Sequence, residues 1–243
     1  MLRATLLTVF SLLCVFFLGA PCLVYAVLSG NTDPLYEVGR ISSKAVLWLA
    51  GVRTEVHGRE KIPAGRAVVF MPNHQSNWDP PGIFVLLPPV LVMGKKEFFR
   101  VPVLGRAMRL RGFIPVDRTN RERAIAAVEA ASQALRAGHS FLAFPEGTRS
   151  RDGRLQTFKK GVFVMAIKAG APIVPVSISG SYRVMRKGEF AIHPGVVRVT
   201  FHDPVPTAGR SVEERRQLIE QVREAIISGL SEEERPLDAV RMS

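Results

Sequence analysis

The sequence predicts an α/β domain with a largely parallel or mixed central sheet, flanked by helices and preceded by a helical membrane anchor. Three observations support this fold class: an uncharged N-terminal run, a later alternation of short apolar stretches with helical patterns, and polar clusters that follow the apolar stretches. A chain of 243 residues can bury the core of one such domain.

The N-terminal run, residues 4–28, contains no charged residue. A helix of about 25 residues, rising about 1.5 Å per residue, is long enough to cross or deeply enter a bilayer. A cleaved signal peptide is the alternative, but the run exceeds the usual apolar region and no small-residue cleavage site closes it. We therefore favour an anchor, and Gly19 and Pro21 leave open a kink or entry into a single leaflet.

A second stretch, residues 36–51, has the pattern of an amphipathic interfacial helix. Arg3 alone precedes the apolar run, whereas several basic residues follow it, so the positive-inside rule predicts that the main domain lies on the cytoplasmic face of the membrane. Cys14 and Cys22 lie in the apolar run and are interpreted as packing residues. We thus divide the chain into membrane-anchoring helices (1–52), a catalytic domain (53–230) and a polar, loosely held tail (231–243).

After residue 52 the pattern alternates between strands and helices. Strands are predicted at 66–71, 90–93, 113–116, 141–144, 173–178 and 196–201. Helices are predicted at 119–137, where Gly138 ends the pattern, and at 160–169 and 211–230.

Polar clusters follow three of the predicted strands: NHQSNWD at 73–79, the end of GFIPVDR at 112–118, and FPEGTRS at 144–150. In α/β sheets functional groups gather in loops beyond the carboxyl ends of the strands. The three clusters can therefore converge on one crevice.

His74 and Asp79 in the first cluster are candidates for a catalytic pair. An imidazole acts as a general base when a carboxylate orients one ring nitrogen and stabilises the imidazolium that forms. The alternative is that Asp79 only caps a helix, because Pro80 suits a first helical turn. The pair alone does not decide between the two.

The residues give little support for an enzyme-borne nucleophile or for a bound metal. No GxSxG elbow occurs, and the cysteines lie in the apolar run, so the nucleophile is expected to be a substrate hydroxyl or a water. No second His or Cys stands at ligand spacing from His74, so we predict neither a metal nor a bound cofactor.

The FPEGTRS cluster has the composition of an oxyanion cradle, with backbone N–H groups, a hydroxyl and flanking basic residues. It is not a Walker A loop, and taken alone it fits a solvated basic loop equally well. Arg118 alone fits a surface salt bridge. The net charge of +12 favours an anionic partner, and the predicted anchor favours a lipid surface over nucleic acid.

In order, NHQSNWD, GFIPVDR, FPEGTRS and IVPV (173–176) resemble the four sequence blocks of glycerolipid acyltransferases of the lysophosphatidic acid acyltransferase (PlsC) type, over residues 53–205. The resemblance implies the fold of that family and a role in phospholipid biosynthesis. The implied reaction transfers a fatty acyl group from acyl-CoA or acyl carrier protein to the 2-hydroxyl of 1-acyl-glycerol 3-phosphate, giving phosphatidic acid. Implied partners are lysophosphatidic acid, the acyl thioester and anionic membrane lipids.

The resemblance also implies roles for individual residues. His74 matches the general base and Asp79 the carboxylate that orients it, so no acyl-enzyme is required. The implied acceptor and phosphate contacts are Arg118, Glu146, Gly147, Thr148, Arg149, Lys159 and Lys160. Supporting roles fall to Asn73, Ser76 and Pro175.

Three other functions are weighed against this one. An acyltransferase that uses glycerol 3-phosphate or another lyso-lipid keeps the same chemistry. A non-catalytic lipid-binding protein has no need of the His74 and Asp79 pair. A hydrolase is disfavoured because neither a nucleophile elbow nor a water-activating metal is indicated.

Overall fold

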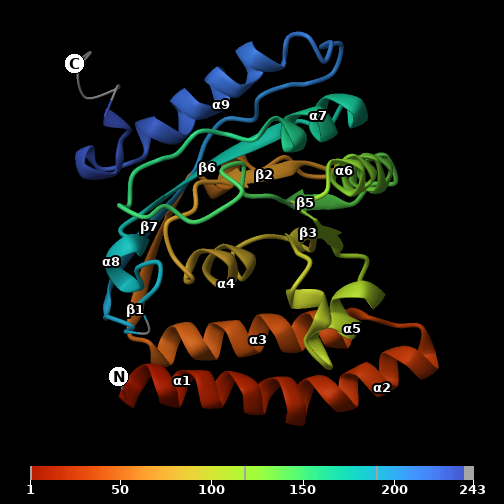
Figure 1. Cartoon of the computed structure of the whole chain (residues 1–243), viewed down its shortest axis with the longest axis vertical. Coiled ribbons are helices and arrows are strands. Elements are labelled where there is room, and N and C mark those ends of the chain that lie inside the picture. Colours follow the sequence, from red (N-terminus) through yellow and green to blue (C-terminus); the bar gives the residue numbers. More distant parts are fainter. Residues whose placement is uncertain (1, 118, 190, 238–243) are drawn as a thin grey trace.

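The structure, a computed structural model, describes residues 2–117, 119–189 and 191–237. Its centre is a seven-stranded sheet with helices on both faces (Figure 1). The strands are β1 (Val52–His57), β2 (Val69–Pro72), β3 (Val90–Lys95), β4 (Ile114–Val116), β5 (Ser140–Leu142), β6 (Ile173–Ser179) and β7 (Gly195–Phe201). The helices of the domain include α4 (Asp79–Phe84), α5 (Leu104–Leu110), α6 (Arg121–Arg136), α7 (Lys160–Ala169), α8 (Ser181–Val184) and α9 (Arg215–Ser228).

The sheet is mixed, with the strand order β1-β7-β6-β2-β5-β3-β4. From β6 to β4 neighbouring strands are parallel, whereas β7 runs antiparallel to β6 and parallel to β1. The carboxyl ends of β6, β2, β5, β3 and β4 therefore lie along one edge. The predicted α/β fold with a mixed sheet is confirmed.

Alternation along the strands divides the core into two layers. Val69 and Met71 of β2 pack toward α6, α7 and α9, together with Phe163 and Leu218. Residues on the opposite face, such as Phe70, belong to a second cluster that includes Trp78 and other residues of the α4 region. Both faces of the central strands are thus buried, which fits their continuous apolar runs.

The N-terminal helices lie together along one end of the domain (Figure 1). Helix α1 (Leu2–Leu13), the π-helical turn η1 (Cys14–Gly19) and α2 (Ala20–Ser29) form one continuous rod, and α3 (Asp33–Leu49) returns between it and the domain. The segment Ala4–Ser29 has a mean hydropathy of 2.4 and is long and apolar enough to cross a membrane. Only 11% of its most apolar window is buried, so most of this apolar surface is exposed.

Polar contacts fix α3 and the turn that precedes it to the domain. The Tyr36 hydroxyl in α3 accepts the N–H of Val90 at 3.0 Å, at the start of β3. The Arg111 guanidinium, just after α5, donates to Thr32 Oγ1 at 3.1 Å, lies 3.3 Å from the Asp33 carboxylate and covers the Tyr36 ring at 4.9 Å. The domain is therefore held at one orientation to the apolar helices.

Two features differ from the sequence-based expectations. Strand β1 was not predicted, because its charged and apolar residues give too weak a pattern, yet it pairs along its whole length with β7. The segment from residue 231 was expected to be loosely held, but its described part is anchored. Glu234 is buried and accepts hydrogen bonds from the Ser179 hydroxyl and the Gly180 N–H at the end of β6.

Candidate active site

The NHQSNWD loop connects the carboxyl end of β2 to α4. The buried amide of Asn73 donates to the carbonyl of Ile178 at 2.8 Å and accepts its N–H at 2.7 Å, which ties the loop to β6. The Ser76 hydroxyl donates to the Met185 carbonyl at 2.9 Å and accepts the N–H of Trp78 at 3.1 Å. Asn73 and Ser76, two of the three predicted supporting residues, thus fix the backbone around His74.

His74 and Asp79 are in direct contact, with 2.8 Å between Nδ1 and Oδ2. The same carboxylate oxygen accepts the N–H groups of Gln75 at 2.6 Å and Ser76 at 2.7 Å. Asp79 begins α4, but these bonds go to the residues before the helix, so it is not the simple cap that the alternative interpretation required. A neutral imidazole in this contact donates Nδ1–H, because a carboxylate only accepts, and its Nε2 lone pair is left for a reacting group.

The walls around His74 are apolar on one side. Its ring lies 4.3 Å from the Phe144 ring, centroid to centroid and 30° from parallel, and its side chain is 14% exposed. Phe144 also lines a cavity of about 510 Å³, which offers room for an aliphatic chain next to the imidazole. The other apolar lining residues include Met93, Val116, Ala124, Val128 and Val162.

Glu146 connects the FPEGTRS loop to His74. Its carboxylate accepts the His74 N–H at 2.6 Å and the Gln156 N–H at 3.0 Å, while the Ser150 N–H donates to the His74 carbonyl at 2.8 Å. Burial raises the pKa of Glu146 to about 8, although the two N–H donors oppose the shift. Glu146 was predicted to contact the acceptor. In the structure this residue is 1% exposed, and its carboxylate instead supports the backbone of His74.

The rest of this loop is more open. Gly147 has a φ of 71°, and a Cβ there would come 3.3 Å from Lys159 Cγ, so both conformation and space favour glycine. Lys187, in the loop after α8, donates to Thr148 Oγ1 at 3.2 Å and to the Arg149 carbonyl at 2.9 Å. The NH1 atom of Arg149 is buried and has no hydrogen-bond partner among the described residues, so it is available to an oxyanion.

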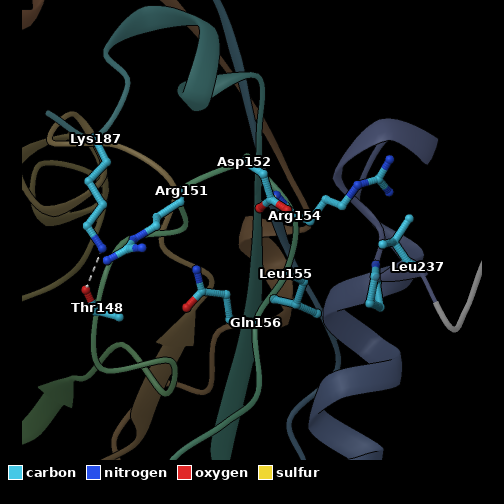
Figure 2. Close-up of a pocket in the computed structure, with 9 residues that line it drawn as sticks. Thr148, Arg151, Asp152, Arg154, Leu155, Gln156, Lys187 and Leu237 are labelled. Carbon is cyan, nitrogen blue, oxygen red and sulfur yellow. Dashed lines mark hydrogen bonds between the residues drawn. The ribbon is translucent and has the colours of Figure 1, made fainter. Parts of the chain in front are cut away.

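A second cavity, of about 610 Å³, is basic (Figure 2). The side chains of Arg151 and Lys187 point toward Thr148, which lines both cavities. Asp152 is the acidic residue in the lining, and the Arg154 N–H and the Ser150 hydroxyl lower its pKa against the effect of burial. Within the described ranges, no carboxylate pairs with Arg149, Arg151, Arg154, Lys159, Lys160 or Lys187.

The remaining predicted residues occupy different settings. Arg118 lies outside the described residues. The adjacent Asp117 accepts a hydrogen bond from Lys96 at 2.9 Å. This bond, together with those from the Thr119 hydroxyl and N–H, holds the pKa of Asp117 well below its usual range. Lys160 begins α7, and Pro175 is buried in β6 beside Met71 of β2. No three His, Cys, Asp or Glu residues gather at metal-binding distance in the described part of the chain, and the absence of metal and cofactor stays a prediction.

Three functional contacts were not found from the sequence: those of Gln75, Gln156 and Lys187. Gln75 donates to the Gly153 carbonyl at 2.9 Å, which adds a further link between the two loops. Lys187 lies far along the chain from the loop that it holds, and no local pattern distinguishes it from other surface lysines. Only the tertiary structure brings these residues together.

Comparison with known proteins agrees with this geometry. Residues 53–179 match the model of a family described as acyltransferase. A 1-acyl-sn-glycerol-3-phosphate acyltransferase of Limnanthes douglasii is 32% identical over 209 residues, which cover 84% of this chain and 73% of the relative. One of Borreliella burgdorferi, with the same name, is 32% identical over 79% of this chain and 77% of its own length.

The crystal structure of the 1-acyl-sn-glycerophosphate acyltransferase PlsC of Thermotoga maritima is similar to the whole fold. The TM-score is 0.80 at 30% identity, and the match covers 94% of this chain and 95% of the other. With the matched family domain and the similarity to these relatives, the chain belongs to the acyltransferase family.

Proposed function

We propose that this chain transfers a fatty acyl group from a thioester to the 2-hydroxyl of 1-acyl-glycerol 3-phosphate, forming phosphatidic acid. The observation that carries the proposal is the 2.8 Å contact between His74 Nδ1 and Asp79 Oδ2, with an apolar cavity and a basic cavity beside it. An acceptor with one acyl chain and one phosphate matches both cavities. The names of the relatives support the same acceptor.

In the proposed reaction, His74 Nε2 takes the proton of the 2-hydroxyl while the hydroxyl oxygen attacks the thioester carbonyl. The carbon–sulfur bond then breaks, and the leaving thiolate takes the proton back from the imidazolium. Asp79 stabilises the imidazolium between these steps and keeps the ring in place. No acyl-enzyme forms, so the protein supplies a base and an oriented site but no nucleophile.

The acceptor phosphate is assigned to the cations around the FPEGTRS loop, with Arg149 as its first contact and Arg118, Lys159 and Lys160 as further candidates. The donor is either acyl-CoA or acyl carrier protein. The basic residues after the apolar run favour the cytoplasmic face of the inner membrane for the domain. Anionic lipids of that membrane are the proposed surroundings.

The test uses the full chain, purified and reconstituted in vesicles, with labelled acyl-CoA or labelled acyl carrier protein as separate donors. Each donor is combined with lysophosphatidic acid, a neutral-headgroup lysophospholipid or glycerol 3-phosphate, and the products are identified by mass. We expect lysophosphatidic acid to have the highest kcat/KM of the three acceptors and to give phosphatidic acid as the product. A higher kcat/KM with another acceptor would replace the proposed substrate, and turnover no greater than that of His74→Ala would refute acyl transfer.

A further inference from the structure

The segment of residues 95–111, from the last residue of β3 to the turn before β4, combines positive charge with exposed apolar side chains. It contains six Lys or Arg residues and one acidic residue, Glu97. Three apolar side chains are also exposed: Phe98 at 54%, Val101 at 40% and Leu110 at 41%. Large apolar side chains among cations are typical of surfaces that enter the headgroup region of a membrane.

Internal contacts show that these exposed side chains belong to a well-packed turn. The short helix η3 (Phe98–Arg100) leads into α5, and Arg109 donates to the Phe99 carbonyl at 2.6 Å and to the Gly105 carbonyl at 3.2 Å. A Cβ at Gly105 would come 2.2 Å from the Phe99 carbonyl oxygen, so the backbone packs closely here. Phe99 is buried while its neighbour Phe98 faces outward, so the exposure of Phe98 is built into the turn.

The 95–111 segment is docked against the apolar N-terminal helices. Val103 has a φ of 62°, which is costly for a β-branched residue, and its side chain lies against Gly19 in η1, where an added Cβ would be 3.6 Å away. At the other end of α5, Arg111 bonds Thr32 and pairs with Asp33, at the turn between α2 and α3. Figure 1 shows α5 beside this end of the helices.

We propose that the 95–111 segment is a second membrane-contact surface, in which Phe98 and Val101 insert among the headgroups of anionic phospholipids. Two observations select a bilayer over a protein partner. The segment packs against the apolar, mostly exposed helix Ala4–Ser29 through Val103 and α5. Its exposed cations Arg100 and Arg106 have no ion-pair partner among the described residues. A cation at an anionic bilayer strengthens binding about fivefold, at about 1 kcal/mol each.

The position of this surface connects it to the cavity next to His74. Gly94 of β3 lies under the Phe99 ring, where a Cβ would be 3.3 Å from the ring, and the preceding Met93 lines the apolar cavity. A bilayer in contact with Phe98 would therefore lie close to the end of β3 that borders this cavity. If the proposed function holds, acyl chains have a short path between the lipid phase and the site.

The experiment measures lipid contact directly, without acyl transfer. In a Cys14→Ala, Cys22→Ala background, a polarity-sensitive fluorophore is attached to Val101→Cys, which keeps Phe98 intact. The matched control is Ile125→Cys on α6, a residue 58% exposed but remote in sequence and structure from the helices. Both proteins are reconstituted in vesicles of phosphatidylglycerol or of phosphatidylcholine, with lipid-borne nitroxide or aqueous iodide as quencher.

We expect nitroxide to quench the label at position 101 at least threefold more than the label at 125, and iodide to show the reverse. Replacing Arg100 and Arg106 by Gln should reduce the nitroxide quenching in phosphatidylglycerol and leave phosphatidylcholine unchanged. Equal quenching at both positions would overturn the proposal. Protection from iodide without nitroxide quenching would also overturn it, because it would indicate contact with a second protein chain.

The same measurement in the His74→Ala variant separates this inference from the proposed function. The proposed membrane contact at position 101 does not involve His74, whereas the proposed acyl transfer needs it. Lipid quenching that persists in the inactive variant would support the contact surface whatever the reaction proves to be.

Discussion

The two loops that meet at His74 are organised in opposite ways. In the loop at 73–79, Asn73, Ser76 and one Asp79 oxygen are buried and bonded to backbone groups. In the FPEGTRS loop and its neighbours, the cations are partly exposed and have no carboxylate partner among the described residues. The first loop uses most of its polar groups to hold its own backbone, and of its buried side-chain atoms only Trp78 Nε1 and Asp79 Oδ1 have no partner among the described residues. The second loop leaves its positive charges available to a ligand.

This difference follows from what each loop has to do. A general base must be oriented before the substrate arrives, because misalignment lowers the rate. Phosphate recognition needs cations whose hydrogen bonds are not already used by the protein. The largest effects on turnover are therefore expected in the 73–79 loop, and effects on substrate KM in the basic one.

The largest expected effect is that of His74→Ala. Loss of a general base usually lowers the rate about 100- to 10,000-fold, and kcat with saturating donor and acceptor measures it. The fold should persist, because the other polar groups of the loop keep their backbone partners. Circular dichroism and retention in the membrane fraction are the controls, and more than about a tenth of the wild-type rate would refute the role of His74.

Glu146→Gln tests the link between the two loops through its effect on the thermal stability of the protein. Because the folded-state pKa of Glu146 is raised from 4.5 to about 8, its contribution to stability is present below pH 4.5 and is lost as the pH rises toward 8. The slope from one proton is at most about 1.4 kcal/mol per pH unit. We expect Tm to fall between pH 5 and 8 in the wild type and to fall less in Glu146→Gln.

Glu213→Gln is the matched control, because this glutamate is exposed at the surface before α9. It should reproduce the wild-type dependence of Tm on pH. If Glu146→Gln follows the same curve, the buried carboxylate does not titrate in this range, and its role is limited to the two hydrogen bonds.

The sequence predicts the fold well where the apolar runs are continuous. Strands such as β6 and helices such as α7 lie within a residue or two of their predicted bounds, because burial on both faces produces a strong pattern. Strand β1 was missed because its alternating charged residues fit a loop equally well. The segment forms a strand because it pairs with β7, which is remote in sequence.

The site shows the same limit. The contact of His74 with Asp79 lies within five residues of sequence and could be anticipated, including the start of α4 at Asp79. The role of Glu146 could not, because motif position suggested a substrate contact while burial directs its carboxylate to the N–H of His74. Long-range contacts such as that of Lys187 with Thr148 leave no local pattern.

A smaller effect, on KM, is expected for Arg149→Gln. If its buried NH1 atom binds the acceptor phosphate, the loss of a charged hydrogen bond of about 1.5–3 kcal/mol should raise the acceptor KM about 10- to 100-fold. The donor KM and kcat should change little. Arg183→Gln is the control, because Arg183 pairs with Glu233 at the surface; equal changes in both substrates' KM would contradict a phosphate contact.

The smallest effect is expected for Lys160→Gln, and it separates long-range attraction from direct contact. Lys160 begins α7 and Lys168 lies in its last turn, where it pairs with Glu129 at 2.8 Å. An exposed charge contributes at most about 1 kcal/mol, so Lys160→Gln should raise the acceptor KM less than about fivefold, and Lys168→Gln should leave it unchanged. Near 1 M salt, where the screening length is about 3 Å, the effect should vanish if Lys160 acts only through space. An effect that persists in high salt would place Lys160 in contact with the phosphate and extend the ligand-binding loop into the first turn of α7.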